Sequence, residues 1–307
     1  MSYKPVTFHG KNGGQISLAE INGLYLPVTG SEESLTKHLD RLSNGHLQAR
    51  DSDVVICAYP KSGLHWIWEV VTMLERSTPS PSNDFMEQHS FEFSSIKHLS
   101  SLQSPRVFVT HLTFDNLPQS FRDRRCKIVY ICRDPRPVAV SFFHYVRQMK
   151  VRGTTDRSVL SAAWPDFLQF FKEGKVPFGS WLSHTKAWDK VITDRPGYPI
   201  HVVNFEDTKQ DSMKEIMKLN SFLRTSVSMT ICAEIANNTK IEKLRKLKAT
   251  VSDNTMKQYF KESKYPMYRK GVTDDWKNLF TVKQNEDIIH GNMGQLRTSN
   301  IKLTSML

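Results

Sequence analysis

The sequence lacks a hydrophobic run long enough to cross a bilayer. Of its 307 residues, 39% are hydrophobic and 24% are charged, which is typical of a soluble globular chain. A membrane-spanning helix needs about 20 consecutive apolar residues, and no stretch approaches that length. The segment Met1–Gly10 has neither an apolar core nor a small-residue cleavage site, so we expect no secretory signal there.

Cysteine is scarce and is not spaced for metal binding. The four cysteines are Cys57, Cys126, Cys132 and Cys232. They include no CxxC pair and no Cys/His cluster with zinc spacing. Cys57 and Cys132 fall in apolar runs, where cysteine behaves as a small hydrophobe. We therefore expect four reduced thiols in a cytoplasmic protein, and no metal site.

Acidic residues are outnumbered, and the formal net charge is +11. This excess favours anionic ligands. The basic residues are spread along the chain, and no basic tail, basic helix, RNP-like strand or zinc finger is present. A solvated basic surface therefore explains the charge better than nucleic-acid binding, and we expect no nucleic-acid partner.

The most informative segment runs from Asp53 to Trp66. Its β-branched start, Val54-Val-Ile56, predicts a buried strand. The next residues, Tyr59-Pro-Lys-Ser-Gly63, break that strand, and helical spacing resumes at Trp66. A strand, a tight basic turn and a helix start direct backbone N–H groups and a lysine at one point. This arrangement predicts a P-loop-like site for a phosphate or a group of similar shape.

The same segment lacks the Walker A order, because Lys61 precedes Gly63 instead of following a glycine. The departure counts against a nucleotide-binding protein that transfers phosphoryl groups, which would also need an acidic magnesium ligand at a strand end. Taken alone, the turn has an ordinary structural alternative. Any strand-to-helix turn can contain proline, glycine and a surface lysine.

Runs of apolar residues alternate with segments of helical spacing. Strands are predicted at 53–59, 106–111, 127–133 and 198–205, and helices at 64–76, 135–149, 164–173, 180–194, 207–224 and 229–248. This alternation predicts an α/β fold with a mostly parallel central sheet flanked by helices on both faces. Residues 1–50 show weak periodicity and are expected to be irregular. We expect a single domain over 1–307, with its motifs in 53–286.

Three predicted strands end in residues that can bind anions or move protons: Lys61-Ser62-Gly63, His111, and Arg133, with Ser141 in the next helix. Ligands bind at the carboxyl ends of the strands in open α/β sheets, so we expect these residues to converge. Each has a structural alternative when taken singly. His111 could be an ordinary hydrogen-bonded residue, and Arg133 could form a surface ion pair with Asp134.

Four segments resemble, in order, motifs of the cytosolic sulfotransferases, which use 3′-phosphoadenosine-5′-phosphosulfate (PAPS) as sulfuryl donor. Tyr59-Pro-Lys-Ser-Gly63 with Trp66 is similar to the 5′-phosphosulfate loop, and Arg133-Asp-Pro-Arg-Pro-Val-Ala-Val-Ser141 to the 3′-phosphate segment. Tyr268-Arg-Lys-Gly271 with Asp275-Trp276-Lys277 resembles the C-terminal nucleotide loop, and Lys277-x-x-x-Thr281-Val282-x-x-x-Glu286 the dimerisation motif. Because four ordered motifs are far more specific than one, the chain is identified as a member of this family.

The resemblance implies transfer of a sulfuryl group from PAPS to a hydroxyl or amine, without a metal, leaving 3′,5′-adenosine bisphosphate (PAP). It implies that Lys61 stabilises the leaving phosphate oxygen, that His111 is the general base, and that Ser141 restrains Lys61 until the acceptor arrives. The implied nucleotide-binding residues are Lys61, Ser62, Gly63, Leu64, His65, Trp66, Arg133, Ser141, Phe205, Thr239, Arg269, Lys270 and Gly271. Trp66 could equally be a core tryptophan. A homodimer through Lys277–Glu286 is also implied.

Five positions depart from the family pattern. Leu64 and His65 replace two threonines, Phe205 replaces a tyrosine, Asp274 replaces a glycine, and Val109 replaces a lysine found in some members. His65 is expected to donate in place of the missing hydroxyl. Because Lys61, His111, Arg133 and Ser141 are retained, we expect altered donor affinity with the chemistry intact.

The identity of the acceptor is not encoded in any motif. An apolar, aromatic pocket is expected, and its candidate residues are Phe85, Phe114, Phe142 and Tyr145, with Phe142 favoured. These residues could equally belong to the core, and phenols, steroids, alcohols and amines all remain possible acceptors. A catalytically weak member that binds nucleotide or a hydrophobic ligand is the alternative function. Such a protein would need neither Lys61 nor His111.

Overall fold

The computed structural model describes residues 3–27, 32–151, 158–250, 267–268, 274–296, 299, 301 and 303. The chain divides into two compact units. The first comprises Met1–Asp40, Pro135–Lys186 and Ser252–Thr298, and the second Arg41–Asp134, Ala187–Val251 and Ser299–Leu307. The single domain expected over 1–307 stays a prediction. None of the helices in these described ranges combines the length and hydrophobicity needed to cross a bilayer.

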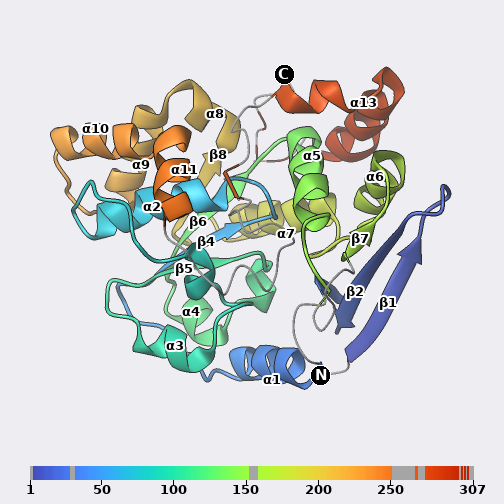
Figure 1. Ribbon diagram of the computed structural model, residues 1–307. Helices are drawn as coiled ribbons and strands as arrows, with labels where there is room; N and C mark the ends of the chain where they lie inside the picture. Colours follow the sequence, from blue (N-terminus) through green and yellow to red (C-terminus); the bar gives the residue numbers. More distant parts are fainter. Residues whose placement is uncertain are drawn as a thin grey trace. The chain divides into compact units, whose positions relative to one another are not determined.

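The second unit contains the predicted parallel sheet (Figure 1). Its strands, in spatial order, are β5 (Val107–Thr110), β4 (Val54–Ala58), β6 (Lys127–Cys132) and β8 (Ile200–Asn204). All three pairings are parallel. The four carboxyl ends therefore lie along one edge of the sheet, as the sequence predicted.

The two faces of this sheet are covered by different layers. On one face, Val54, Ile56 and Val129 belong to a core that includes buried residues of α2 (Leu64–Glu75), α9 (Ser212–Leu223) and α10 (Met229–Asn238). On the other face the cover is aromatic. Phe108 contacts Phe121 of α4 (Gln119–Asp123) edge to face, with ring centroids 5.4 Å apart. Helices on both faces confirm the predicted fold class.

The aromatic layer also includes the second half of α7 (Trp181–Asp194). Tyr130 of β6 stacks on Trp188 of this helix, with ring centroids 4.9 Å apart. Phe114 contacts the same Trp188 edge to face at 6.1 Å. Both faces are therefore closed by large side chains, as the near-continuous apolar runs of the strands require.

Two predicted helices are each divided in two. A single helix was expected over 207–224, but α8 (Phe205–Gln210) ends before Asp211, whose side chain accepts from the Lys214 N–H to begin α9. The helix expected over 229–248 is divided at Thr239, where α10 ends, and α11 (Ile241–Thr250) follows. An aspartate or threonine inside a periodic run can satisfy helix-end groups as readily as it continues the helix.

The remaining helical elements are shorter or belong to the first unit. They are α1 (Glu32–Ser43), η1 (Met86–His89), α3 (Ile96–Ser101), η2 (Phe114–Asn116), α5 (Pro135–Val146), α6 (Trp164–Lys172), η3 (Asp274–Asn278), α13 (Val282–Ile288), η4 (Ile289–Met293) and η5 (Gly294–Leu296). The α5 helix ends at Val146, three residues short of the expected end at Met149.

The prediction that residues 1–50 are irregular was wrong. In the first unit β1 (Tyr3–His9), β2 (Gln15–Ile21) and β3 (Leu24–Pro27) form an antiparallel sheet, and β7 (Leu160–Ser161) also pairs with β2. Gly13 and Gly23 take φ of 81° and 80° in the two turns, a conformation that glycine adopts without strain. Because β1 exposes much of its surface, its apolar periodicity is weak.

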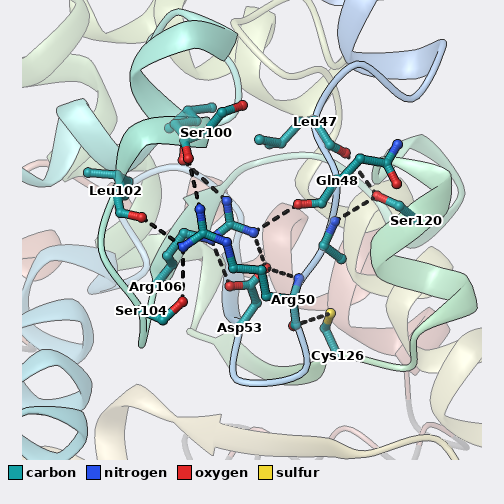
Figure 2. Close-up of polar contacts among 12 residues, drawn as sticks. Leu47, Gln48, Arg50, Asp53, Ser100, Leu102, Ser104, Arg106, Ser120 and Cys126 are labelled. Carbon is teal, nitrogen blue, oxygen red and sulfur yellow. Dashed lines mark hydrogen bonds and ion pairs between the residues drawn. The ribbon is translucent and has the colours of Figure 1, made fainter.

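A buried ion pair fixes the opposite end of the parallel sheet (Figure 2). Asp53, just before β4, accepts from the guanidinium of Arg106, just before β5, at 2.8 and 2.5 Å. The same guanidinium donates to the Gln48 carbonyl at 2.9 Å. Arg50 continues the network, donating to the carbonyls of Leu102 and Ser100 at 2.9 Å each. Side chains therefore set the spacing of the two strand starts.

Replacing Arg106 by alanine is expected to lower the free energy of unfolding by about 3–5 kcal/mol, because the carboxylate of Asp53 would stay buried without its partner. The two side chains are 1% and 0% exposed. Urea denaturation measures the loss. Arg124→Ala is the matched control: it removes an ion pair with Asp51 whose side chains are 51% and 91% exposed, worth roughly 0–1 kcal/mol. Equal losses in the two variants would contradict the prediction.

Candidate active site

The loop Tyr59–Gly63 connects β4 to α2 and has a constrained backbone. Lys61 and Gly63 take positive φ angles of 68° and 104°. The Ser62 N–H donates to the Tyr59 carbonyl at 3.2 Å, and the N–H groups of Trp66 and Ile67 donate to the Gly63 carbonyl. The loop thus turns sharply into the N-terminus of a twelve-residue helix. The first N–H groups and the dipole of such a helix favour an anion.

Two further features of the loop fit a phosphate. The hydroxyl oxygen of Ser62 is buried and has no hydrogen-bond partner among the residues that the structure describes. A Cβ placed on Gly63 would collide with the ring of Phe205, so the backbone passes directly under an aromatic side chain. A buried donor, a close backbone and a lysine match the donor set of a phosphate site.

Gly63→Ala is expected to lower the free energy of unfolding by about 1–2 kcal/mol from the left-handed backbone alone, with a further loss from the collision with Phe205. Urea denaturation of the single variant and of Gly63→Ala/Phe205→Ala separates the two causes. The double variant should be less destabilised than the sum of the single variants, because the second change removes the collision. Strict additivity would contradict the steric part of this prediction.

His111 follows β5 and reaches across to β4. Its Nδ1 lies 2.8 Å from the Ala58 carbonyl oxygen. Since a carbonyl only accepts, Nδ1 carries the proton, and Nε2 carries the lone pair. Burial lowers the pKa of His111, and the charges of His65 and Lys61 act in the same direction. The imidazole is therefore held neutral, with Nε2 as a hydrogen-bond acceptor, at the carboxyl edge of the sheet.

The carboxylate of Glu92 opposes that shift and holds the backbone of His111. It accepts from the His111 N–H at 2.5 Å, from the Thr110 hydroxyl at 2.7 Å and from the Ser90 hydroxyl at 2.8 Å. Glu92 is 4% exposed, and its charge raises the pKa of His111. This one side chain therefore both orients the histidine and supports its basicity.

Arg133 follows β6 and joins the loop to the end of β8. Its Nη1 donates to the Lys61 carbonyl oxygen at 2.8 Å. The guanidinium carbon lies 4.2 Å from the centroid of the Phe205 ring, within cation–π distance. Because Phe205 also packs on Gly63, the ends of β4, β6 and β8 share one cluster of contacts. The convergence expected from the sequence is observed for Lys61, His111 and Arg133.

Four other predicted nucleotide residues lie on α2 or contact it. Leu64, the first residue of α2, is 3% exposed and belongs to the core. The Nε2 of His65 lies 3.0 Å from a carboxylate oxygen of Glu87 on η1. The indole N–H of Trp66 donates to the Thr239 carbonyl at 3.0 Å. The structure thus brings Trp66 and Thr239 together and pairs His65 with a carboxylate that the sequence analysis did not include.

Comparison with known proteins assigns this arrangement to a family. Residues 51–296 match the model of the sulfotransferase domain. The chain belongs to the sulfotransferase family. Among its relatives, human sulfotransferase 1E1 is 34% identical over 83% of this chain and 87% of its own length. Human sulfotransferase 1C2 is 32% identical over 89% and 90%.

A solved structure supports the same assignment. The crystal structure of mouse sulfotransferase SULT7A1 complexed with PAP superposes with a TM-score of 0.73 and 28% sequence identity. The match covers 92% of this chain and 96% of the mouse chain. The protein is therefore an enzyme of the sulfotransferase class, with the α/β fold that its sequence predicted.

Several predicted site residues of this sulfotransferase belong to the first unit or lie outside the described residues. Ser141, Phe142 and Tyr145 belong to α5 in the first unit, where Phe142 is 1% exposed and packs against Phe167 at 6.2 Å. Arg269, Lys270 and Gly271 lie outside the described residues. Asp274 begins η3. The nucleotide and acceptor roles of all these residues stay predictions.

The two other acceptor candidates, and Val109, are buried in the second unit. Phe114 is 1% exposed and contacts Tyr198 edge to face at 5.1 Å. Phe85 is 5% exposed, directly before η1. Val109 is 1% exposed in the core of β5. Acceptor contact by either phenylalanine stays a prediction.

The sequence analysis missed three carboxylates that lie next to candidate site residues: Glu87 beside His65, Glu92 beside His111 and Glu206 near Arg133. A usable signal existed for Glu92, which stands as a lone charge in the apolar run Phe91-Glu92-Phe93. The position of Glu92 depends on a backbone bridge between residue 90 and Val109 of β5. This bridge could not be predicted, because residue 90 belongs to no predicted strand. Glu206 directly follows Phe205, which sequence analysis had singled out.

Burial of all four cysteines fits their expected reduced state. Each is free and buried. Burial raises the pKa of the Cys57 and Cys232 thiols and that of Cys126 to about 12. A thiol that stays protonated is a poor nucleophile and a poor metal ligand. None of the four is suited to the chemistry of the site.

Proposed function

We propose that this sulfotransferase transfers the sulfuryl group of PAPS to a hydroxyl or amine of a small, largely apolar acceptor: a phenol, steroid, alcohol or amine. The observation that carries the proposal is the linkage of four strand ends. His111, after β5, donates to the Ala58 carbonyl at the end of β4. Arg133, after β6, donates to the Lys61 carbonyl in the loop after β4. The buried Ser62 hydroxyl and the close approach of Gly63 to Phe205 fit a phosphate ligand.

PAPS supplies a sulfur electrophile with a phosphate leaving group. In this reaction the Nε2 of His111 accepts the proton of the acceptor hydroxyl or amine, since Nδ1 is occupied by the Ala58 carbonyl. The ammonium of Lys61 stabilises the negative charge that develops on the leaving oxygen. The new S–O or S–N bond forms as the bond from sulfur to the phosphate oxygen breaks. PAP is then the second product.

Nucleotide binding is assigned to the remaining residues by charge and hydrogen-bonding capacity. The Ser62 hydroxyl and the first N–H groups of α2 bind the 5′-phosphate. Arg133 binds the 3′-phosphate through its guanidinium, aided by Ser141, Arg269, Lys270 and the backbone of Gly271. Trp66, Phe205 and Thr239 contact the nucleoside. Leu64 lacks a hydroxyl, and His65 is proposed to contribute to the 5′-phosphate site while held by Glu87.

Two measurements test the function. Isothermal titration with PAP should give saturable binding, and labelled PAPS should sulfate at least one member of a panel of phenols, steroids, alcohols and amines in the presence of a metal chelator. Absence of PAP binding would contradict the proposal. PAP binding without turnover on the whole panel would favour the alternative, a weak or non-catalytic member that binds nucleotide.

We propose in addition a homodimer through the segment Lys277–Glu286. The side chains of Lys277, Thr281, Val282 and Glu286 are exposed. Val282 is 76% exposed at the start of α13, where the capping box of Thr281 and Gln284 fixes the helix start. An apolar side chain presented on a rigid helix start suits a small symmetric contact.

Val282→Glu is expected to convert the dimer to a monomer, because the charge would be buried at the contact. Sedimentation velocity at micromolar protein measures the change. Met229→Glu is the matched control, since Met229 is an exposed apolar residue, 66% accessible, outside the segment. A monomeric wild-type protein, or a dimeric Val282→Glu variant, would contradict the proposed interface.

A further inference from the structure

Glu206 is a buried carboxyl group next to the arginine assigned to the 3′-phosphate. It lies in the first turn of α8, directly after Phe205, and is 8% exposed. Its Oε1 accepts from the Asp134 N–H at 3.2 Å. Its Oε2 is buried and has no hydrogen-bond partner among the described residues. A carboxylate that is half-satisfied in this way is costly to keep charged.

The charges around Glu206 come from two elements. Directly after β6, the charge of Arg133 favours the ionised form of Glu206 and the charge of Asp134 disfavours it. Cys132, the last residue of β6, stays a neutral thiol because burial raises its pKa. From α8 itself come Asp207 and Lys209. Burial dominates and raises the pKa of Glu206 to about 7. The group therefore changes charge near neutral pH.

Arg133 ties this carboxyl to the nucleotide site. The guanidinium stacks on Phe205, the residue before Glu206, and donates to the Lys61 carbonyl of the phosphate loop. It is also the cation that stabilises the charged form of Glu206. An anion bound by Arg133 would neutralise that cation and add a negative charge close to the carboxylate. Both effects disfavour the ionised carboxylate.

We propose that binding of the 3′-phosphate at Arg133 is coupled to proton uptake by Glu206. The carboxyl thus acts as a proton-linked component of the nucleotide site. This inference rests on the proposed function, because it assumes that the nucleotide is PAP or PAPS. By linkage, a group whose pKa rises on binding strengthens binding as the pH falls. Nucleotide affinity therefore decreases as the pH rises through neutrality.

The test is titration calorimetry with PAP at pH 7 in buffers of different ionisation enthalpy, which counts the protons exchanged on binding. Wild-type protein should take up more protons than Glu206→Gln, by a fraction of one. The affinity of the wild type should fall about threefold more than that of Glu206→Gln between pH 6.5 and 7.5, as expected for one linked group. Asp207→Asn, which removes one charge from the adjacent position, should differ from the wild type by much less than Glu206→Gln does.

A second ligand tests the role of the 3′-phosphate. Adenosine 5′-monophosphate lacks the 3′-phosphate, so the difference in proton uptake between wild type and Glu206→Gln should be smaller with it than with PAP. Proton exchange by the 3′-phosphate itself has the opposite sign to uptake by Glu206. A guanidinium favours the phosphate dianion, so the ligand would release protons on binding. Equal proton counts for wild type and Glu206→Gln with PAP, or the same difference between the two proteins with both ligands, would overturn the inference alone. Absence of PAP binding to the wild type would overturn the proposed function, and this inference with it.

Discussion

Replacing His111 by alanine is expected to lower turnover by about a hundredfold or more, the contribution of a positioned general base. PAP affinity should be unchanged, because the imidazole is assigned to the acceptor proton and not to the nucleotide. Its Nδ1 is bound to the Ala58 carbonyl, so the base is oriented before any ligand binds. Steady-state rates with labelled PAPS, together with calorimetric PAP affinities, measure the two quantities.

The pH dependence of turnover supplies a second readout for His111. Burial lowers the pKa of this group below its ordinary 6.5. A base must be unprotonated to act, so activity should fall as the pH decreases through that lowered value, and the acid limb should lie below pH 6.5. Glu92→Gln should move the acid limb further down, because the Glu92 carboxylate raises the pKa of His111.

The control for His111→Ala is His98→Ala, at an exposed histidine of α3, which should retain full turnover. Near-normal turnover of His111→Ala would remove the general-base assignment. Loss of PAP binding in the same variant would show that His111 has a role in nucleotide binding instead. If the acid limb of the pH profile did not move in Glu92→Gln, the claim that the Glu92 carboxylate raises the pKa of His111 would be contradicted.

The parallel sheet was predictable because its signal is local. Strands such as β4 and β6 are buried on both faces, and burial on both faces requires a continuous apolar run that can be recognised in sequence. The antiparallel sheet of the first unit carries no such run. The first strand, β1, is partly or fully exposed along its length, and its partner residues are determined by pairing with β2.

The candidate site was predictable to the extent that it follows the strand ends. Lys61, His111 and Arg133 each follow a strand that was assigned from sequence, and parallel pairing brought them together. Glu92 and Glu87 come from the stretch between α2 and β5, which has only short helical turns. Their positions depend on side-chain contacts such as His65–Glu87, and no local pattern encodes these.

Lys61→Ala is expected to lower turnover by about 10²–10³-fold, the effect of removing one group that stabilises a developing oxyanion. The charge on the leaving oxygen develops only in the transition state. The loss should therefore fall mainly on kcat, with a smaller effect on the dissociation constant of PAP. Folding should be retained, since the contact that Arg133 makes with this residue is to the backbone carbonyl and not to the ammonium.

Three results distinguish this role from simple charge attraction. Lys97→Ala, at an exposed lysine on α3, should leave kcat unchanged. Lys61→Arg keeps the charge but replaces a point donor by a planar fork, so it should bind PAP nearly normally while kcat stays low. If Lys61→Ala lowered PAP affinity and kcat/KM by the same factor and left kcat intact, Lys61 would stabilise the ground state and the transition state equally. The transition-state role would then have to lie with another cation of the site.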